Sequence, residues 1–227
     1  VVKVSASSIN EGASFLWGDN AKQLSFTADK GNGKWMQRCW AATTTGQPAE
    51  HLTLTFYTRS IHQLQPLEKD ECYYLAVDNS GTGKFPVGQI RYYKAQDSHA
   101  DSIVFAGIAA DAGESIFTLR AAKDFFATVE IARPRCSTAQ KGQVKVLFTG
   151  GTAPYNVTIS LDGKACYSQS TSDSLITISD LLQGKYTIAA KDHTGKTLLN
   201  EVMVSNADMA DVPELQDVRF ARGASRD

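Results

Sequence analysis

The sequence predicts an all-β protein made of two tandem β-sandwich domains. Short runs in which apolar and polar residues alternate recur along the chain, the pattern of half-buried strands. Glycine and proline turn signals separate these runs at spacings of about 8–12 residues, as in a sandwich. Long amphipathic windows with helical periodicity are missing from the sequence, which argues against a helical or mixed class.

The first half of the chain carries about eight or nine predicted strands, enough for a sandwich or jelly-roll-like domain. The clearest is 51–58, where Leu52, Leu54 and Phe56 alternate with polar residues. The segment 35–43 has apolar side chains on both faces and is predicted to be one central strand. The other predicted strands are 1–8, 14–17, 24–28, 72–78, 89–95, 102–108 and 115–121.

The second half is organised around Gly150–Ile159, which ends one strand, turns and begins the next. Apolar residues alternate on both sides, in 144–148 and in 155–161. Asp162-Gly163 follows, a strong hairpin signal because both central residues of a type I′ turn need a positive φ. About six strands at this spacing predict an immunoglobulin-like sandwich. The remaining predicted strands lie in 164–169, 174–178, 181–189 and 198–204.

These strands divide the chain into three segments. Residues 1–126 form the first predicted domain, and residues 127–206 form the immunoglobulin-like one. Phe125 and Val129 indicate the strand that opens the second domain. Residues 207–227 lose periodicity and gain charge, so we expect a linker or tail there.

The run GGTAPYNVTI, followed by ISDLLQGKYTIAAKDHTGKTLLNEVMVS, resembles the repeat module of gliding-motility adhesins and related surface proteins of the Bacteroidota. That module has a Gly-Gly-x-x-Pro-Tyr turn, an L-x-x-G-x-Y strand and a D-x-x-G turn. The matching positions are Gly150, Gly151, Pro154, Tyr155, Leu181, Gly184, Tyr186, Asp192 and Gly195. Cys136 matches the first cysteine of the module, but Thr197 and Leu198 stand where its second is usual. The resemblance implies an immunoglobulin-like adhesin repeat.

The runs FLWGDN, WMQRCWAATTTG and YYLAVDNSGTGKF resemble a region of long secreted Bacteroidota surface proteins. The matching positions are Phe15 to Asn20, Arg38, Trp40, Asp78, Ser80, Gly81, Gly83 and Phe85. Those proteins leave the cell by the type IX secretion system and carry this region between a lectin-like domain and adhesin modules. The resemblance implies a secreted protein at the outer cell surface. Its expected partners are other modules of the same parent protein and a surface glycan or protein.

Charge and hydropathy narrow the function classes further. The formal net charge is -1, and Lys/Arg and Asp/Glu are interspersed, so no nucleic-acid partner is expected. No apolar run approaches the roughly 20 residues of a membrane helix, so no membrane insertion is expected. No signal peptide is visible, and we expect a fragment of a longer precursor.

The four cysteines divide two and two, Cys39 with Cys72 and Cys136 with Cys166. None lies in a C-x-x-C pair, so zinc is not expected. One disulfide per domain and four free thiols both remain open, since geometry decides between them.

One loop has the beginnings of a calcium site. Asp78, Ser80 and Thr82 alternate as oxygen donors, and Gly83 stands at the sixth position, where the chain must turn sharply. The twelfth position is Gln89 instead of Glu, so affinity would be poor, and a glycine-rich turn is the alternative. No other cofactor is predicted.

No residue pattern in the sequence indicates a catalytic site, and we predict that the chain is not an enzyme. The four histidines are scattered, and neither an H-E-x-x-H nor a G-x-S-x-G motif is present. Adjacent tyrosines of a strand face opposite ways, so Tyr73 and Tyr92 are candidates for outward rings that stack on a sugar or peptide. Filling of the core by these rings is the alternative.

Two tripeptides, 101–103 and 173–175, match the Asp-Ser/Thr-aliphatic O-glycosylation signature of this phylum, which makes Ser102 and Ser174 candidate acceptors. From these patterns and resemblances we expect that the chain is a non-catalytic adhesion or structural module, a scaffold or stalk, of a secreted bacterial protein. The alternatives are a carbohydrate-binding module and an accessory domain of an exported enzyme.

Overall fold

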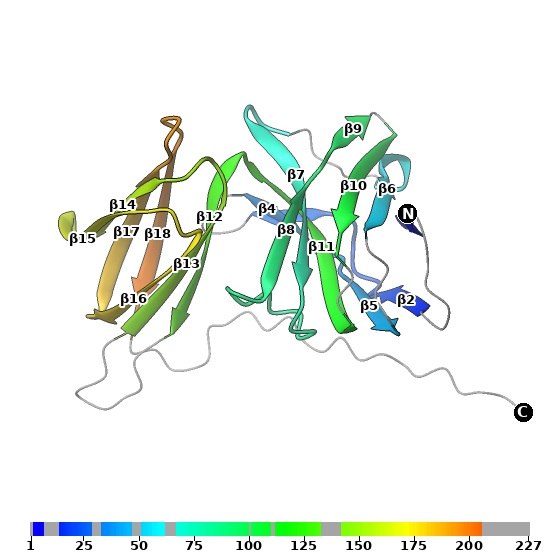
Figure 1. Ribbon diagram of the computed structural model, residues 1–227, viewed down its shortest axis with the longest axis horizontal. Helices are drawn as coiled ribbons and strands as arrows, with labels where there is room; N and C mark the ends of the chain where they lie inside the picture. The colour runs from blue at the N-terminus through cyan, green and yellow to red at the C-terminus, as the bar shows by residue number, and fades with distance from the viewer. Residues whose placement is uncertain are drawn as a thin grey trace, which may run out of the picture.

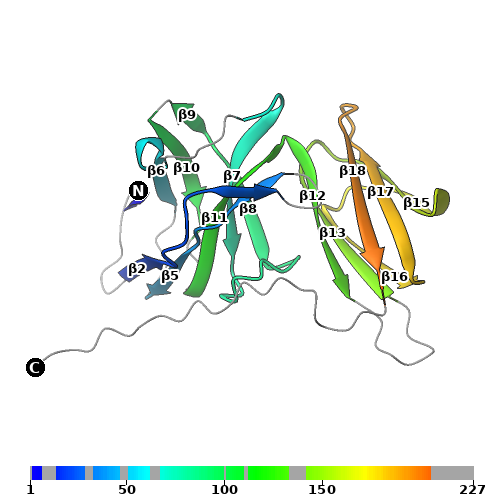
Figure 2. The same ribbon diagram turned by 180° about the vertical axis from the view of Figure 1, so that it is seen from behind.

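The computed structural model describes residues 2–6, 14–28, 33–46, 51–61, 67–99, 101–109, 112–132 and 142–205. In this part of the chain the regular structure is β-strand apart from one short 3-10 turn, η1 (Thr58–Ser60), so the all-β prediction is confirmed. The strands form two bodies that lie side by side along the long axis of the molecule (Figures 1 and 2). The predicted tail 207–227 and Cys136 lie outside the described residues. No helix in the described ranges is long and apolar enough to cross a membrane.

The first domain consists of two antiparallel sheets, here named A and B. Sheet A has the order β1 (Val2–Ala6), β6 (Leu52–Tyr57), β10 (Ser102–Ile108) and β9 (Asp97–His99). In sheet B the long strand β11 (Gly113–Lys123) is central. One side of β11 carries β5 (Trp40–Thr45), β2 (Ser14–Asp19), β4 (Lys34–Met36) and β3 (Phe26–Ala28), and the other carries β7 (Glu71–Asp78) and β8 (Ile90–Lys94).

Sheets A and B pack on each other through large aromatic side chains. Trp40 of β5 lies edge-on to Phe56 of β6, with ring centroids 5.2 Å apart, and stacks on Phe117 of β11 at 5.8 Å. All three are buried. Each such side chain contributes roughly 1.5–3 kcal/mol through its burial, so these three rings together stabilise the packing of the two sheets by several kcal/mol.

The single strand predicted for 35–43 is wrong, because β4 and β5 are separated by a break at 37–39. The hydroxyl of buried Thr118 on β11 lies under this break, 3.1 Å from the carbonyl oxygen of Met36 and 2.8 Å from that of Arg38. The Thr118 hydroxyl therefore forms hydrogen bonds with carbonyl groups at the point where the backbone hydrogen bonds between strands stop. The alternation of apolar and polar residues in the sequence cannot reveal such a break.

The second domain is a sandwich of sheets C and D. Sheet C has the order β12 (Phe125–Ala132), β13 (Gly142–Gly150) and β16 (Leu175–Leu181). Sheet D has the order β15 (Lys164–Thr171), β14 (Tyr155–Leu161), β17 (Gly184–Lys191) and β18 (Thr197–Val204).

Two local features agree with the predicted immunoglobulin-like fold. Asp162 and Gly163 have φ values of 48° and 79°, as the predicted hairpin turn requires. Tyr186, near the start of β17, donates its hydroxyl hydrogen bond to the carbonyl of Leu182 at 3.0 Å. This is the tyrosine corner of immunoglobulin-like domains.

The two domains are joined with almost no linker. Strand β11 ends at Lys123 and β12 begins at Phe125, so Asp124 alone lies between them. The strands thus divide between the domains at Asp124, slightly before the predicted boundary at 126.

The structure shows why residue 150, at the end of β13, is a glycine. Gly150 pairs with Phe125 and has a φ of 69°. A Cβ at this position would lie 1.8 Å from the carbonyl oxygen of Asp124. The glycine is therefore required by close backbone contact at the domain junction as well as by its positive φ.

We predict that Gly150→Ala destabilises the protein by at least about 3 kcal/mol, because backbone strain and a steric clash act together. Gly163→Ala is the matched control, since Gly163 also has a positive φ but nothing lies within 4 Å of the added Cβ. It should cost only about 1–2 kcal/mol. Urea unfolding of both variants measures the difference, and equal losses would contradict the role given to the junction.

Candidate functional site

The most unusual buried group lies on the face of sheet B that points away from its own core. Along β11, Phe117, Leu119 and Ala121 face sheet A, so the alternate residues Thr118 and Arg120 face the opposite way. Arg120 is nevertheless only 1 % exposed, because β12 of the second domain lies over it. A buried guanidinium is costly unless other groups replace its water.

Three aromatic rings and two hydroxyl groups surround Arg120. Its guanidinium carbon lies 4.2 Å from the ring centroid of Phe126, 4.8 Å from that of Trp35 and 5.5 Å from that of Tyr92. Its Nη1 donates to the Tyr92 hydroxyl at 2.8 Å and to the Thr128 hydroxyl at 3.0 Å. We call Arg120 and the four residues around it the Arg120 cage; these four are Trp35, Tyr92, Phe126 and Thr128. Cation–π attraction of this kind reaches about 2 kcal/mol when the pair is desolvated.

Phe126 of β12 is the residue that the second domain inserts into the first. It is 0 % exposed and lies edge-on to Tyr74 and Tyr92, with centroids 5.0 Å and 5.1 Å away. Burial is the main cause that raises the pKa of Tyr74, so this hydroxyl stays neutral. Ala122 completes this small apolar cluster.

Polar contacts hold the junction on either side of Phe126. The Asp124 carboxylate binds Lys94 of the first domain and Lys196 of the second. The hydrogen bonds from Lys196 and then Lys94 lower the pKa of Asp124, and they raise the pKa of each lysine. Further along β12, Glu130 accepts the backbone N–H of Val87 at 2.7 Å.

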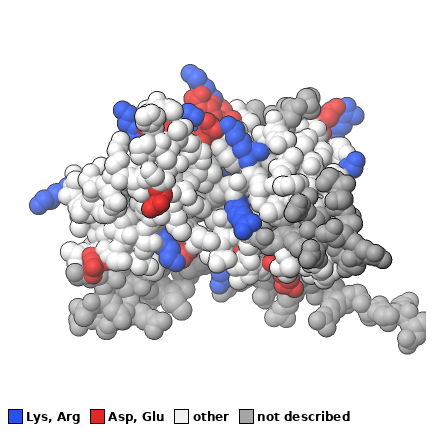
Figure 3. Space-filling view, viewed as in Figure 1, with Lys and Arg blue, Asp and Glu red and all other residues white. Residues whose placement is uncertain are grey.

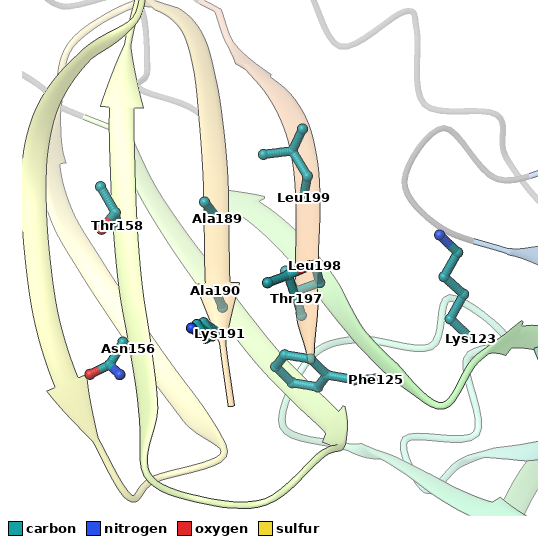
Figure 4. Close-up of a pocket in the computed structure, with 10 residues that line it drawn as sticks. All are labelled: Lys123, Phe125, Asn156, Thr158, Ala189, Ala190, Lys191, Thr197, Leu198 and Leu199. Carbon is teal, nitrogen blue, oxygen red and sulfur yellow. The ribbon is translucent and has the colours of Figure 1, made fainter. Parts of the chain in front are cut away.

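Several hollows lie beside this junction, among them an open one of about 390 Å³ between β8 and β13 and two larger ones. The first of these two, which we call the Trp35 groove, has a volume of about 630 Å³. The second is an open hollow of about 560 Å³ over sheet D, shown in Figure 4. There Asn156 and Thr158 on β14, Ala189 and Lys191 on β17, and Leu199 on β18 line a shallow surface. Phe125 is the one aromatic residue among the described residues of this lining, and it is buried in the core of the second domain, so it offers no exposed ring.

Charged side chains are spread thinly over the face that is drawn in Figure 3. On the face drawn in Figure 3, lysine and arginine are interspersed with aspartate and glutamate, and uncharged residues cover most of both domains. That face carries no basic stripe of the kind that follows a nucleic-acid backbone.

The structure brings the residues of the predicted calcium loop together. The buried Asp78 carboxylate accepts hydrogen bonds from the N–H and hydroxyl of Ser80, the hydroxyl of Thr82 and the N–H of Phe85. Asp78 is 0 % exposed, so these bonds hold a compact turn. In the described part of the chain, no three His, Cys, Asp or Glu side chains are grouped as a metal site. Calcium binding stays a prediction, and the ion would have to displace these four donors.

The prediction that Tyr73 and Tyr92 present outward rings to a ligand must be corrected. Tyr73 is 5 % exposed and packs in the core between sheets A and B, so it cannot stack on a ligand. Burial raises its pKa to about 12. Tyr92 does point away from that core, but it faces Phe126 and Arg120 of the junction. Alternation predicted that one ring of each pair points away, but could not show that another domain covers it.

A disulfide between Cys39 and Cys72 is ruled out by the structure, where both are free thiols. Cys39 lies beside Thr118, whereas Cys72 pairs with Ala122, four residues further along β11. Four residues of a strand span roughly 13 Å, twice the reach of a disulfide. Cys166 is an exposed free thiol, while Cys136 lies outside the described residues.

The candidate glycosylation sites differ in accessibility. Ser102 is half-buried within β10, and the neighbouring Asp101 forms a bidentate ion pair with Arg59. Ser174 and Asp173 are both exposed just before β16. Accessibility therefore favours Ser174 over Ser102 as an acceptor.

Comparison with known proteins gives a family match for the first domain. Residues 3–114 match the family described as "Domain of unknown function (DUF8202)". No curated protein matches the sequence. Among solved structures, the chain is similar to the "Crystal structure of beta-1,2-glucanase from Parabacteroides distasonis", with 9% sequence identity and a TM-score of 0.22. The match covers 88% of this chain and 37% of that chain, and a TM-score this low carries no argument about fold or activity.

The ion pairs at Asp124 predict a pH-dependent contribution to stability. Because the folded pKa of Asp124 is lowered, this contribution is present above the unfolded value of about 4 and is lost as the pH falls through the folded value. We expect the protein to be more stable than Asp124→Asn at pH about 6, and this difference in stability to shrink as the pH falls below about 4. Thermal unfolding at both pH values measures this, because other carboxylates titrate equally in the two proteins. A stability difference that does not change with pH would argue against the ion pairs.

Proposed function

We propose that the chain is a rigid two-domain structural module, a scaffold or stalk segment of a secreted bacterial surface protein, and that it does not act as an enzyme. The observation that carries this proposal is the burial of Phe126 against Arg120, Tyr74 and Tyr92 of the first domain. A segment that holds other modules at a fixed distance needs domains that do not rotate freely.

The packing at the junction supports rigidity energetically. Burial of Phe126 contributes roughly 1.5–3 kcal/mol, and each desolvated cation–π contact adds up to about 2 kcal/mol. Domains of one chain move relative to each other by default unless their interface is large and apolar. Here the near absence of a linker and the insertion of an aromatic anchor both oppose that motion.

The proposed location and the proposed partners of the module rest on the sequence resemblances. The run at 150–159 resembles adhesin repeats, and the segments around Trp17 and Asp78 resemble secreted surface proteins. Both support a place at the outer cell surface, with other modules of the same parent protein as partners. An exposed aromatic side chain, Trp17 on the edge strand β2, offers such a partner an apolar contact.

The test is a distance measurement between spin labels in the two domains. Labels introduced as unnatural amino acids at the exposed positions Glu114 and Lys164 avoid the native thiols. We expect one narrow distance distribution. Phe126→Ala should broaden it, because the anchor that holds β12 on sheet B is removed.

Phe148→Ala is the matched control, since Phe148 is equally buried but lies within the core of the second domain. Both variants should lose about 3–5 kcal/mol of stability, but only Phe126→Ala should broaden the distances. A broad distribution in the unmodified protein would overturn the proposal of a rigid module.

A further inference from the structure

The Trp35 groove has the composition of a binding site. It lies between the β3–β4 hairpin, the loop after β7, and β12. The rings of Trp35 and Phe85 meet there with centroids 5.3 Å apart and planes inclined by 52°. Its volume of about 630 Å³ falls within the range of roughly 300–1,000 Å³ that small-molecule sites occupy.

The polar groups of the groove favour an anionic ligand. Lys22 and Lys84 line it and are both exposed. Neither ammonium group forms an ion pair with another described residue, whereas Lys34 is bound to two glutamates nearby in the same domain. No aspartate or glutamate is among the described residues that line the groove. Its formal charge is therefore positive, on a surface whose overall charge is close to zero.

Hydroxyl and amide groups complete the lining. Thr27 and Gln37 come from the first domain and can exchange hydrogen bonds with ligand hydroxyls, whereas the hydroxyl of Thr128 from the second domain is bound to Arg120 and Tyr92. Cys39 also lines the groove. Burial raises the pKa of its thiol, while the hydrogen bond with Thr118 and the charge of Lys22 oppose this rise. The thiol is thus neutral, and the positive charge comes from the two lysines.

We propose that the Trp35 groove binds a short acidic oligosaccharide, one that carries uronic-acid carboxylates. A sugar ring presents an apolar C–H face that packs on aromatic rings, and its hydroxyl groups match the threonine and glutamine side chains. Its carboxylates match the two lysines. A neutral sugar would leave the lysines unused, and an inorganic polyanion would leave the aromatic pair unused.

The groove depends on the docking of the two domains. Thr128 and Val129 of β12 form one wall, while Trp35 and Phe85 of the first domain form the other. Trp35 also contacts Arg120, so the cage that holds the domains together supports the aromatic platform. This site adds a ligand to the structural role; it rests on the same docking of the two domains, but not on the use of the module as a stalk.

The experiment is a calorimetric titration of the 227-residue protein with three ligands in turn: tetragalacturonate, neutral maltotetraose and tripolyphosphate. We expect tetragalacturonate to bind at least tenfold more tightly than the other two, and its affinity to fall as salt is added. Lys22→Gln with Lys84→Gln should weaken binding roughly tenfold. Phe85→Leu, which keeps an apolar side chain without a ring, should weaken it about threefold or more.

Lys3→Gln with Lys164→Gln is the matched control, because it removes the same charge from exposed positions outside the groove. It should leave the affinity unchanged. The proposal is overturned if tetragalacturonate gives no binding up to about 5 mM, or if both double variants weaken it equally. Equal binding of tripolyphosphate, unaffected by Phe85→Leu, would also overturn it, because the lysines would then act only as a diffuse charge. Thermal unfolding of each variant confirms that it is folded.

Discussion

The burial of one arginine side chain under an aromatic ring of the other domain determines how this molecule is built. Arg120 is placed on the outer face of sheet B by simple strand alternation, where a single sandwich would leave it in water. The second domain covers it and replaces that water with Phe126 and the Thr128 hydroxyl. Removing only one side of such an arrangement leaves a buried charge with fewer partners, which is strongly unfavourable. The two domains therefore depend on each other at this point.

The strand patterns could be predicted from the sequence because they reflect burial within each domain. Alternation located most strands, and Asp162-Gly163 correctly indicated a hairpin, since both features depend on neighbouring residues. The break between β4 and β5 could not be predicted, because it depends on Thr118, a residue some eighty positions away. Contacts over such distances leave no periodic signal in the sequence.

The candidate site was predicted less well, and for a related reason. The sequence pattern makes Tyr73 a candidate outward ring, but in the structure it faces sheet A across the core. Tyr92 points away from that core, and its hydroxyl group forms a hydrogen bond with Thr128 of the second domain. The residues that do line a groove, Trp35 with Phe85 and the two lysines, come from separate segments of the first domain, and docking of the second domain adds Thr128 and Val129. The one available signal was that 35–43 appeared apolar on both faces, which indicated that something covers its outer side.

The central claim is that Arg120 and Phe126 join the two domains into one rigid body. Residual dipolar couplings of the backbone amides, measured in one aligning medium, test it most directly. If the claim holds, a single alignment tensor fits the couplings of strands β1 to β11 and of strands β12 to β18 together. Two tensors of clearly different magnitude, one for each domain, would show that the domains reorient independently and would contradict it.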